Sequence, residues 1–315
     1  MFPVKPRVYI DGKDGTTGLQ IYERLGGRSD IELLLIDEAK RKDPAERKKL
    51  MDAADIVFLC LPDAAAAEAV ELVENPNTRI IDASTAHRTA SGWVYGFPEL
   101  GPEQKAAIQT SRRVANPGCH ATGFLSTAAP LVKLGILPRD YPVAVYSLTG
   151  YSGGGKKMIA QYGDTDRGTE FDAPRIYGLS LRHKHLPEMQ KIAGLEFAPV
   201  FNPVVDDYYK GMATTILLQN RLLHGQPSAE EICGALAEFY QGQTFVKVVP
   251  FGTNDSLLSA NKMAGKDTLE INVCGNQEQT MVTALFDNLG KGASGAAVQN
   301  MNLMLGFKET AGLTL

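Results

Sequence analysis

The sequence lacks the features that mark membrane, secreted and disulfide-bonded proteins. No apolar run approaches the roughly 18 residues of a transmembrane helix, and the first residues, MFPVKPRVYI, contain no signal-peptide core. Cysteine is scarce, and the four are far apart: Cys60, Cys119, Cys233 and Cys274. Their spacing forms neither a CxxC metal motif nor a disulfide framework, so each thiol has to be judged alone.

The sequence also lacks an excess of charge of either sign. It has 32 Lys and Arg against 36 Asp and Glu, a formal net charge of −4, and no dense basic stripe that would hold nucleic acid or an anionic membrane. The 315 residues, 44% hydrophobic and 22% charged, are enough for two globular domains. We expect a cytoplasmic protein whose partners are small molecules or other protein chains.

The first half of the chain predicts a doubly wound parallel sheet. Short apolar strands alternate with helical stretches, of which 17–25 and 64–73 are the clearest, and this order is typical of βαβ units. The predicted strands are 7–10, 32–36, 56–61, 79–82 and 114–116. We therefore expect a Rossmann-type α/β domain over residues 1–117.

The second half predicts an α+β domain, residues 118–287, built on a large mixed or antiparallel sheet. The predicted strands are 143–148, 197–201, 212–219, 245–250, 269–274 and 281–286, and the predicted helices are 121–134, 229–240 and, at the end of the chain, 292–306. Ser228 and Glu231 have the spacing of a capping box at the start of the middle helix.

A glycine-rich turn follows the first predicted strand. Gly12, Gly15 and Gly18 have the spacing GxxGxxG, with Thr16 and Thr17 between the last two. Glycines permit a tight turn and a close backbone approach, and the amides of a following helix can hold a pyrophosphate. A turn that binds nothing is the alternative, but the position directly after the first strand favours dinucleotide binding.

The residues after the second predicted strand bear on the choice of dinucleotide. Asp37 lies about 20 residues after Gly18, where a carboxylate accepts the ribose hydroxyl of NAD. Lys40, Arg41 and Lys42 follow at once, and they are suited to the extra phosphate of NADP. The same charges also suit a solvated helix face, so the local sequence leaves NAD and NADP open.

Cys119 is the candidate nucleophile. It follows a predicted strand and a Pro-Gly turn, at the expected start of a helix. Helix-end amides favour an anion, and cysteines at such positions tend to have lowered pKa values. Cys60, Cys233 and Cys274 lie within strand or helix patterns and are expected to be structural.

Two histidines, His183 and His185, are candidate proton partners for the thiol. Their spacing places both imidazoles on one side of an extended strand, and Pro187 and Glu188 then begin a helix. A zinc pair is the competing interpretation, but no third ligand stands at a suitable spacing. His120, next to the thiol, is expected to be only a space-filling residue at the start of the helix.

The loop Gly150-Tyr151-Ser152-Gly153-Gly154-Gly155-Lys156-Lys157 is a further candidate site. Exposed amides with cations at the end suit an anionic group, and a flexible loop without function is the alternative.

Three segments carry a resemblance to a known family. They are Asn116-Pro117-Gly118-Cys119, His183-Lys184-His185-Leu186-Pro187-Glu188, and the segment 287–300, DNLGKGASGAAVQN. On these the chain resembles the N-acetyl-gamma-glutamyl-phosphate reductases of the short type, which are similar to aspartate-semialdehyde dehydrogenases. Two segments depart from longer relatives: the glycine turn reads Gly-Lys-Asp-Gly-Thr-Thr-Gly, and His87 stands before Arg88 where Phe is usual.

The resemblance implies reduction of an acyl phosphate with NADPH, and we expect no metal. It implies that Cys119 forms a thioester and that His183 is the acid–base group, with a pH-rate limb near the usual imidazole pKa of about 6.5. Residues 288–315 would complete the first domain, and the large sheet would join subunits of a homodimer or homotetramer. The implied substrate residues are Arg88, Asn116, Ser152, Gly153, His185 and Glu188, and Asn288 is an implied cofactor residue.

Two other functions remain open from the sequence. The nearer is another acyl-phosphate reductase of the same fold, such as an aspartate-semialdehyde dehydrogenase. The farther is a non-catalytic NADP-binding module with an exposed thiol that senses redox state.

Overall fold

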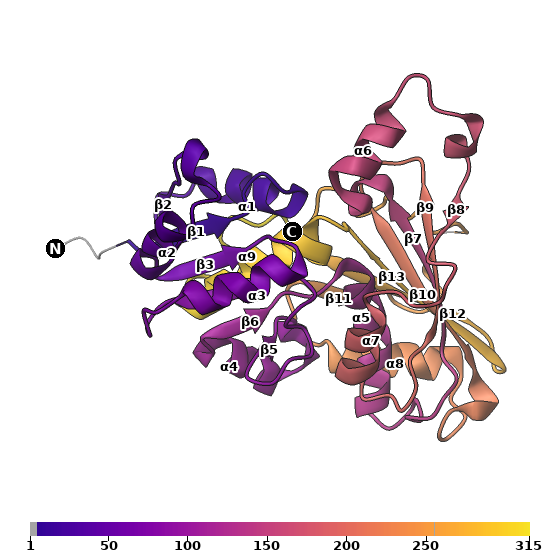
Figure 1. Cartoon of the computed structure of the whole chain (residues 1–315). Coiled ribbons are helices and arrows are strands. Elements are labelled where there is room, and N and C mark those ends of the chain that lie inside the picture. The colour runs from indigo at the N-terminus through magenta and orange to yellow at the C-terminus, as the bar shows by residue number, and fades with distance from the viewer. Residues whose placement is uncertain (1–4, 255) are drawn as a thin grey trace. The chain divides into compact units, whose positions relative to one another are not determined.

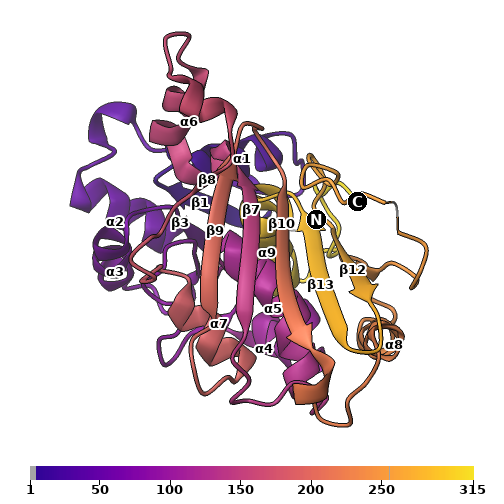
Figure 2. The same cartoon turned by 90° about the vertical axis from the view of Figure 1, so that its right-hand side faces the viewer.

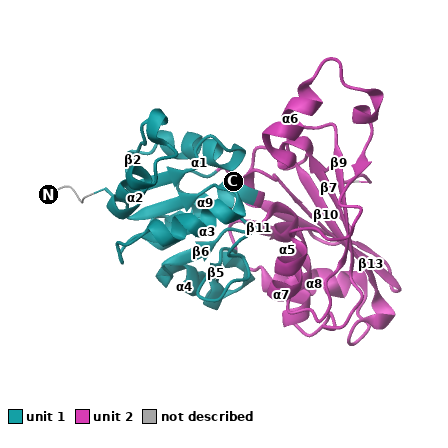
Figure 3. Cartoon of the chain, viewed as in Figure 1, with its two compact units in different colours: residues 1–117, 293–313 teal, residues 118–292, 314–315 magenta. Residues whose placement is uncertain are grey.

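The computed structural model describes residues 5–254 and 256–315 (Figure 1). The chain divides into two compact units, which Figure 3 colours separately. Unit 1 comprises residues 1–117 and 293–313, and unit 2 comprises residues 118–292 and 314–315. Within the described residues, no helix has both the length and the apolar character needed to cross a membrane.

Unit 1 contains a six-stranded sheet in which every neighbouring pair is parallel. The strand order is β2-β1-β3-β4-β6-β5. The strands are β1 (Arg7–Asp11), β2 (Glu32–Leu34), β3 (Ile56–Leu59), β4 (Arg79–Asp82), β5 (Val94–Tyr95) and β6 (Arg113–Ala115). The order reverses beside β1, and ligands of such sheets bind at the carboxyl ends of the strands near this point.

Alternating side chains of these strands bury both faces of the sheet. Val8 and Ile10 face helices α1 (Thr16–Gly26), α4 (Pro102–Thr110) and α9 (Gly295–Leu305) in one core cluster. Tyr9 belongs to a second cluster with residues of α2 (Pro44–Ala53) and α3 (Asp63–Leu72). The last helix of the chain thus covers a sheet made from the first hundred or so residues.

Unit 2 contains a mixed seven-stranded sheet of order β11-β12-β13-β10-β7-β9-β8. The strands are β7 (Ala144–Gly150), β8 (Arg175–Ile176), β9 (Val200–Asp206), β10 (Met212–Gln219), β11 (Val246–Val248), β12 (Leu269–Gly275) and β13 (Gln279–Phe286). Pairs β7/β9 and β11/β12 are parallel and the others are antiparallel. The predicted fold class, a Rossmann-type domain with an α+β domain on a mixed sheet, is confirmed.

One face of this sheet is covered by helices. Helix α5 (Cys119–Lys133) packs on β10 and β13, and it also contacts α7 (Leu186–Ala193) and α8 (Ala229–Phe239). Figure 2 looks onto the opposite face. Tyr146 and Leu217 alternate along their strands with Ser147 and Thr214, which contact α5, so they lie on this opposite face, where both are exposed. We call this opposite side the open face.

Several predicted elements differ from the structure. The strand expected at 197–201 starts later than predicted. It is β9, which begins at Val200, where the chain first pairs with β7. The loop expected at 150–157 contains a 3₁₀ turn, Tyr151–Gly154, followed by helix α6 (Gly155–Gly163). The prediction of a strand around His183 is wrong: a turn closed by a 3.0 Å hydrogen bond from the Leu186 N–H to the His183 carbonyl oxygen leads into α7.

Candidate active site

The glycine turn of unit 1 is built by backbone contacts that leave no room for side chains. A Cβ on Gly12, whose φ is +84°, would lie 2.4 Å from the carbonyl oxygen of Cys60. A Cβ on Gly18 would lie 2.3 Å from the carbonyl oxygen of Gly12. Gly15 is the N-cap of α1, which begins with Thr16 and Thr17, so the spacing serves a tight strand-to-helix turn.

A pocket of about 340 Å³ opens beside this turn, at the carboxyl ends of β1 and β2. Of the predicted cofactor residues, Gly12, Arg41 and Lys42 line it, whereas Gly15, Thr16, Thr17 and Gly18 do not. Lys13 also lines the pocket, and its ammonium group lies 4.2 Å from the centre of the Tyr22 ring.

Some of the charges around the pocket already form ion pairs. Arg41 forms ion pairs with Asp14 and, over 2.8 Å, with Glu38. The Asp37 carboxylate accepts a hydrogen bond from the backbone N–H of Ala39, so it caps a 3₁₀ turn at Glu38–Lys40 instead of lining the pocket. Of the basic trio Lys40, Arg41 and Lys42, the last two line the pocket and Lys40 does not.

An ion pair that the sequence did not predict lines this pocket. Arg47 Nη2 lies 2.6 Å from Oδ2 of Asp11, and Asp11 is buried. Burial alone would lower the pKa of Arg47, but the Asp11 carboxylate raises it. Asp11 is the last residue of β1, and nothing in the sequence pointed to Arg47 as its partner.

In unit 2, Cys119 is the first residue of α5. Gly118 is the N-cap in an extended conformation, and no side chain caps the helix. A Cβ on Gly292 would lie 3.1 Å from the Cβ of Cys119, so glycine lets the segment before α9 pack directly on this cysteine. Burial raises the pKa of the Cys60 thiol.

The turn before α7 brings the two predicted histidines together without the expected strand. Their ring centres are 4.8 Å apart, and the backbone N–H of His185 donates a 3.3 Å hydrogen bond to Nδ1 of His183. Burial and the neighbouring Lys184 lower the pKa of His183 from 6.5 to about 4. The lowered pKa lies below the usual imidazole value on which the expected pH limb near 6.5 rests.

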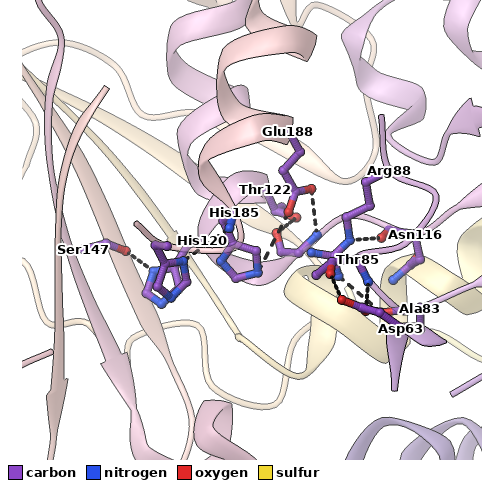
Figure 4. Close-up of polar contacts among 12 residues, drawn as sticks. Asp63, Ala83, Thr85, Arg88, Asn116, His120, Thr122, Ser147, His185 and Glu188 are labelled. Atoms are coloured by element: carbon purple, nitrogen blue, oxygen red, sulfur yellow. Dashed lines mark hydrogen bonds and ion pairs between the residues drawn. The ribbon is translucent and has the colours of Figure 1, made fainter. Parts of the chain in front are cut away.

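Glu188, in the first turn of α7, reaches back to the start of α5. Its Oε2 accepts a 3.2 Å hydrogen bond from the backbone N–H of Gly118 (Figure 4), and its Oε1 lies 3.9 Å from Nε2 of His185. The Glu188 side chain is only 2% exposed. The carboxylate thus joins the residue before Cys119 to the histidine turn.

His120 is buried, and both of its ring nitrogens are hydrogen-bonded, which the sequence did not predict. Its Nδ1 shares a 2.8 Å hydrogen bond with the Ser147 hydroxyl (Figure 4), and its Nε2 shares a 2.6 Å hydrogen bond with the Tyr177 hydroxyl. Ser147 in turn lies 2.8 Å from the hydroxyl of Thr214. The sequence signal was the position next to Cys119, and no motif marked Tyr177.

Arg88 and Asn116 lie together in unit 1. The Nε of Arg88 donates a 3.0 Å hydrogen bond to the Asn116 carbonyl oxygen (Figure 4). The Asn116 amide donates to the carbonyl oxygen of Ala293, which precedes α9. His87 lies 2.6 Å from the buried Asp82 carboxylate, so it holds the segment that carries Arg88.

Asn288, Ser152 and Gly153 form a cluster in unit 2. The Asn288 amide donates a 2.9 Å hydrogen bond to the Ser152 hydroxyl, and its oxygen accepts one from the backbone N–H of Gly211. A Cβ on Gly153 would lie 3.4 Å from the Asn288 nitrogen. Asn288 therefore orders the loop that carries Ser152 in this unit.

Across residues 5–254 and 256–315, no group of three or more His, Cys, Asp or Glu side chains is placed to hold a metal ion. The polar groups just described, a thiol at a helix start with histidines and a carboxylate, are typical of acyl transfer through a cysteine. The glycine cradle is typical of a dinucleotide site.

Two protein-family models match the chain, one over the first half and one over the second. The family described as "Semialdehyde dehydrogenase, NAD binding domain" matches residues 17–108, and "Semialdehyde dehydrogenase, dimerisation domain" matches residues 119–288. These descriptions indicate a nicotinamide cofactor and an oligomer.

Solved structures share the fold. Aspartate semialdehyde dehydrogenase II from Vibrio cholerae has a TM-score of 0.71 at 17% identity, over 96% of this chain and 98% of that chain. A probable aspartate-semialdehyde dehydrogenase from Pseudomonas aeruginosa has a TM-score of 0.72 at 14% identity, over the same shares.

Curated relatives are much closer in sequence. N-acetyl-gamma-glutamyl-phosphate reductase 2 of Nostoc sp. is 48% identical over 98% of this chain and 99% of its own. The protein of the same name from Pseudomonas putida is 49% identical over the same shares. N-acetyl-gamma-glutamyl-phosphate reductase of Sinorhizobium fredii is 50% identical over 96% of this chain and 99% of its own. The chain therefore belongs to the N-acetyl-gamma-glutamyl-phosphate reductase family.

Proposed function

We propose that this protein reduces N-acetyl-gamma-glutamyl phosphate to N-acetyl-L-glutamate 5-semialdehyde and phosphate, with NADPH, in arginine biosynthesis. The observation that carries the proposal is the start of α5: Cys119 opens the helix, and Glu188 ties its N-cap to the turn that holds His183 and His185. Relatives 48–50% identical over nearly the whole chain are named for this reaction.

The residues of unit 1 fit a dinucleotide. Gly12 and Gly18 provide a cradle that any side chain would fill, and the amides at the start of α1 suit a pyrophosphate. NADP is favoured over NAD because Lys42 and Arg41 line the pocket and Asp37 does not. The bound cofactor would supply the hydride. Asn288, which hydrogen-bonds Ser152 in unit 2, is assigned to the cofactor on the family resemblance alone.

Cys119 is the proposed nucleophile. The amide groups at the start of α5 favour the thiolate, which adds to the acyl carbonyl. The carbon–sulfur bond forms, the bond to the phosphate oxygen breaks, and a thioester remains on Cys119 while phosphate leaves and takes a proton from solvent. A thioester accepts hydride more readily than a carboxylate, and the resulting thiohemiacetal oxyanion collapses to aldehyde and thiolate.

His183 is the proposed donor to the oxygen that gains charge in these steps. Because Nδ1 accepts a hydrogen bond from the N–H of His185, the proton of the neutral ring resides on Nε2. A neutral imidazole can stabilise a developing oxyanion by donating this N–H. The lowered pKa favours the neutral imidazole over the acid–base role, with a protonated imidazolium, that the sequence analysis expected.

The anionic groups of the substrate need positive or amide partners. We assign this role to Arg88, whose guanidinium is held by Asn116, and to the loop of Ser152 and Gly153. His185 belongs to the same proposal, whereas the Glu188 carboxylate, occupied by Gly118, is assigned to positioning instead.

We further propose a homodimer in which the open face of unit 2 meets a second copy. Apolar Leu217 and the ring of Tyr146 are exposed there, and the dimerisation-domain family spans this sheet. Leu217→Arg should convert the oligomer to a monomer in size-exclusion chromatography with light scattering. A tetramer and a cytoplasmic location remain predictions from the sequence.

One assay tests the function. Purified protein is given N-acetylglutamate 5-semialdehyde, phosphate and NADP, and NADPH is followed by absorbance. We expect reduction that requires phosphate and Cys119. Preferential turnover of aspartate semialdehyde would assign the protein to its structural neighbours instead. Tight NADP binding without any phosphate-dependent oxidation would support the redox-sensor alternative.

A further inference from the structure

A chain of hydrogen bonds runs from the centre of the unit 2 sheet to the segment before the histidine turn. It begins with Thr214 on β10 and Ser147 on β7, passes through the imidazole of His120, and ends at the hydroxyl of Tyr177. Thr214 and Ser147 are fully buried, and His120 is 2% exposed. The first three members are therefore fixed by the sheet and by α5.

The segment that this chain reaches is anchored at its start by β8 and by a 3.1 Å hydrogen bond from the backbone N–H of Tyr177 to the Pro203 carbonyl oxygen, but its middle is loosely packed. Between Tyr177 and His183, Leu179 is 78% exposed and Leu181 is 62% exposed, so neither joins the core. Leu181 also has a φ of 54°, which is strained for a residue with a side chain. The packing around His183 therefore depends on the ends of this segment.

His183 itself is enclosed by aromatic rings. The ring centre of His120 lies 5.7 Å away, that of Tyr177 6.0 Å and that of Phe201 5.1 Å. Two of these three rings belong to the hydrogen-bonded chain. A change in the chain therefore moves the surroundings of His183 directly.

We propose that Tyr177 and His120 act together as positioning residues that hold the His183 imidazole in a dry, fixed place. The inference rests on the proposed role of His183, and it adds two residues that no motif identified. Neither touches the substrate in this proposal; both act through His183.

The electrostatics agree with a neutral His120. Burial, with a contribution from the neighbouring His183, lowers the pKa of His120 well below its usual value. A neutral imidazole offers one donor and one acceptor, and the Ser147 and Tyr177 hydroxyls use both. The titratable groups that face His183 are His120 from α5, Tyr177, and Lys184 and His185 from the turn.

The test is an NMR titration of the five histidines in uniformly labelled protein, with His183 assigned from the His183→Asn variant. Tyr177→Phe keeps the ring and removes only the hydroxyl. We expect the midpoint of His183 to rise by at least one pH unit from about 4 toward 6.5, because water enters the loosened turn. We expect kcat to fall about tenfold with KM within a factor of two.

His120→Phe should act on the same quantity. If the two residues form one device, the double variant Tyr177→Phe with His120→Phe shifts the midpoint no further than either single variant. Tyr208→Phe is the matched control, because the Tyr208 hydroxyl is buried and makes no hydrogen bond within the described part of the chain. We expect it to leave both midpoint and kcat unchanged.

The outcomes separate the two proposals. An unchanged His183 midpoint in Tyr177→Phe, or fully additive shifts in the double variant, would overturn the positioning role, even if the variants melt at a lower temperature. The titration needs no turnover, so it remains decisive if the wild-type protein fails the phosphate-dependent assay. That failure would overturn the proposed function alone.

Discussion

The Glu188 carboxylate accepts a hydrogen bond from the backbone N–H of Gly118, over 3.2 Å. Gly118 precedes Cys119, and Glu188 lies in the first turn of α7, three residues after His185. The two segments that the sequence singled out separately are thus joined by one buried side chain.

Glu188→Ala should lower kcat by one to two orders of magnitude and leave KM nearly unchanged. Hydrogen bonds to charged groups contribute roughly 1.5–3 kcal/mol, and tenfold in rate corresponds to about 1.4 kcal/mol. Glu188→Gln keeps an oxygen that can accept from Gly118, so we expect most of the activity to return. If Gln is as inactive as Ala, the charge matters and the hydrogen bond does not.

Cys119→Ser should reduce turnover by at least three orders of magnitude, because a serine hydroxyl ionises far less readily than a thiol. NADP binding, measured by calorimetry, should remain close to that of the wild type. Cys60→Ser is the control: burial raises the pKa of that thiol, and we expect a lower melting temperature with turnover of the same order. More than about a tenth of wild-type turnover in Cys119→Ser would remove Cys119 from the mechanism.

Lys42→Ala should reduce the preference for NADP over NAD by about tenfold in kcat/KM. Arg41→Ala should reduce it less, because Arg41 already forms ion pairs with Asp14 and Glu38. The double variant measures the whole contribution of this side of the pocket. A preference ratio that stays constant in all three would show that the 2′-phosphate is recognised elsewhere.

The pH dependence of the wild-type enzyme should lack an imidazole limb near 6.5. Protonation of His183 places a proton on Nδ1 and breaks the hydrogen bond from His185. The pKa of about 4 therefore predicts that the acid limb of kcat/KM from this group lies near pH 4. A limb between 6 and 7 that disappears in His183→Asn would contradict the lowered pKa.

Stability should respond to pH through His120 as well. Its folded-state pKa lies well below 6.5, so below pH 6.5 the unfolded chain binds a proton that the folded chain does not. The free energy of unfolding should fall there by up to about 1.4 kcal/mol per pH unit for this group. Urea denaturation at pH 5.5 and 7.5 should show a smaller difference in His120→Gln than in the wild type.

Gly292→Ala should lower activity by displacing Cys119, although the thiol itself is unchanged. The added Cβ would lie 3.1 Å from the Cβ of Cys119 and from the Asp287 carbonyl oxygen, so the start of α5 has to shift. We expect kcat to fall about tenfold and stability to fall by about 1–3 kcal/mol. Gly234→Ala, in the interior of α8 with open space around it, should keep full activity and gain stability. Equal effects of the two variants would show that contact with Cys119 is unimportant.

The sequence predicted those parts of the fold that depend on local patterns. The strands of unit 1 follow from short apolar runs, and the capping box of Ser228 and Glu231 marks the start of α8 as observed. Strand β8 and strand β5 have two residues each, too few for any periodicity to reveal. Helix α6 was missed because its first residues, Gly155 and two lysines, resemble a loop.

The site was predictable only where a residue carries its own signal. Cys119 and His183 stand in recognisable motifs, and the glycine turn has its spacing. The strand around His183 was wrong because spacing alone cannot distinguish an extended segment from a turn that brings two rings together. The partners Arg47, Tyr177 and Ser147 are 36, 57 and 27 residues from the side chains they bind, so only the tertiary structure reveals them.

Helix α9 has a consequence for how the chain acquires its structure during synthesis. Its residues Ala297, Val298 and Met301 share a core with Val8 and Ile10, so one face of the first sheet has no cover until nearly the whole chain has been made. At roughly 5–20 residues per second, translation leaves that apolar face waiting for many seconds. Nascent unit 1 is therefore a natural client for chaperones, and fragments that end before residue 295 should aggregate when expressed alone.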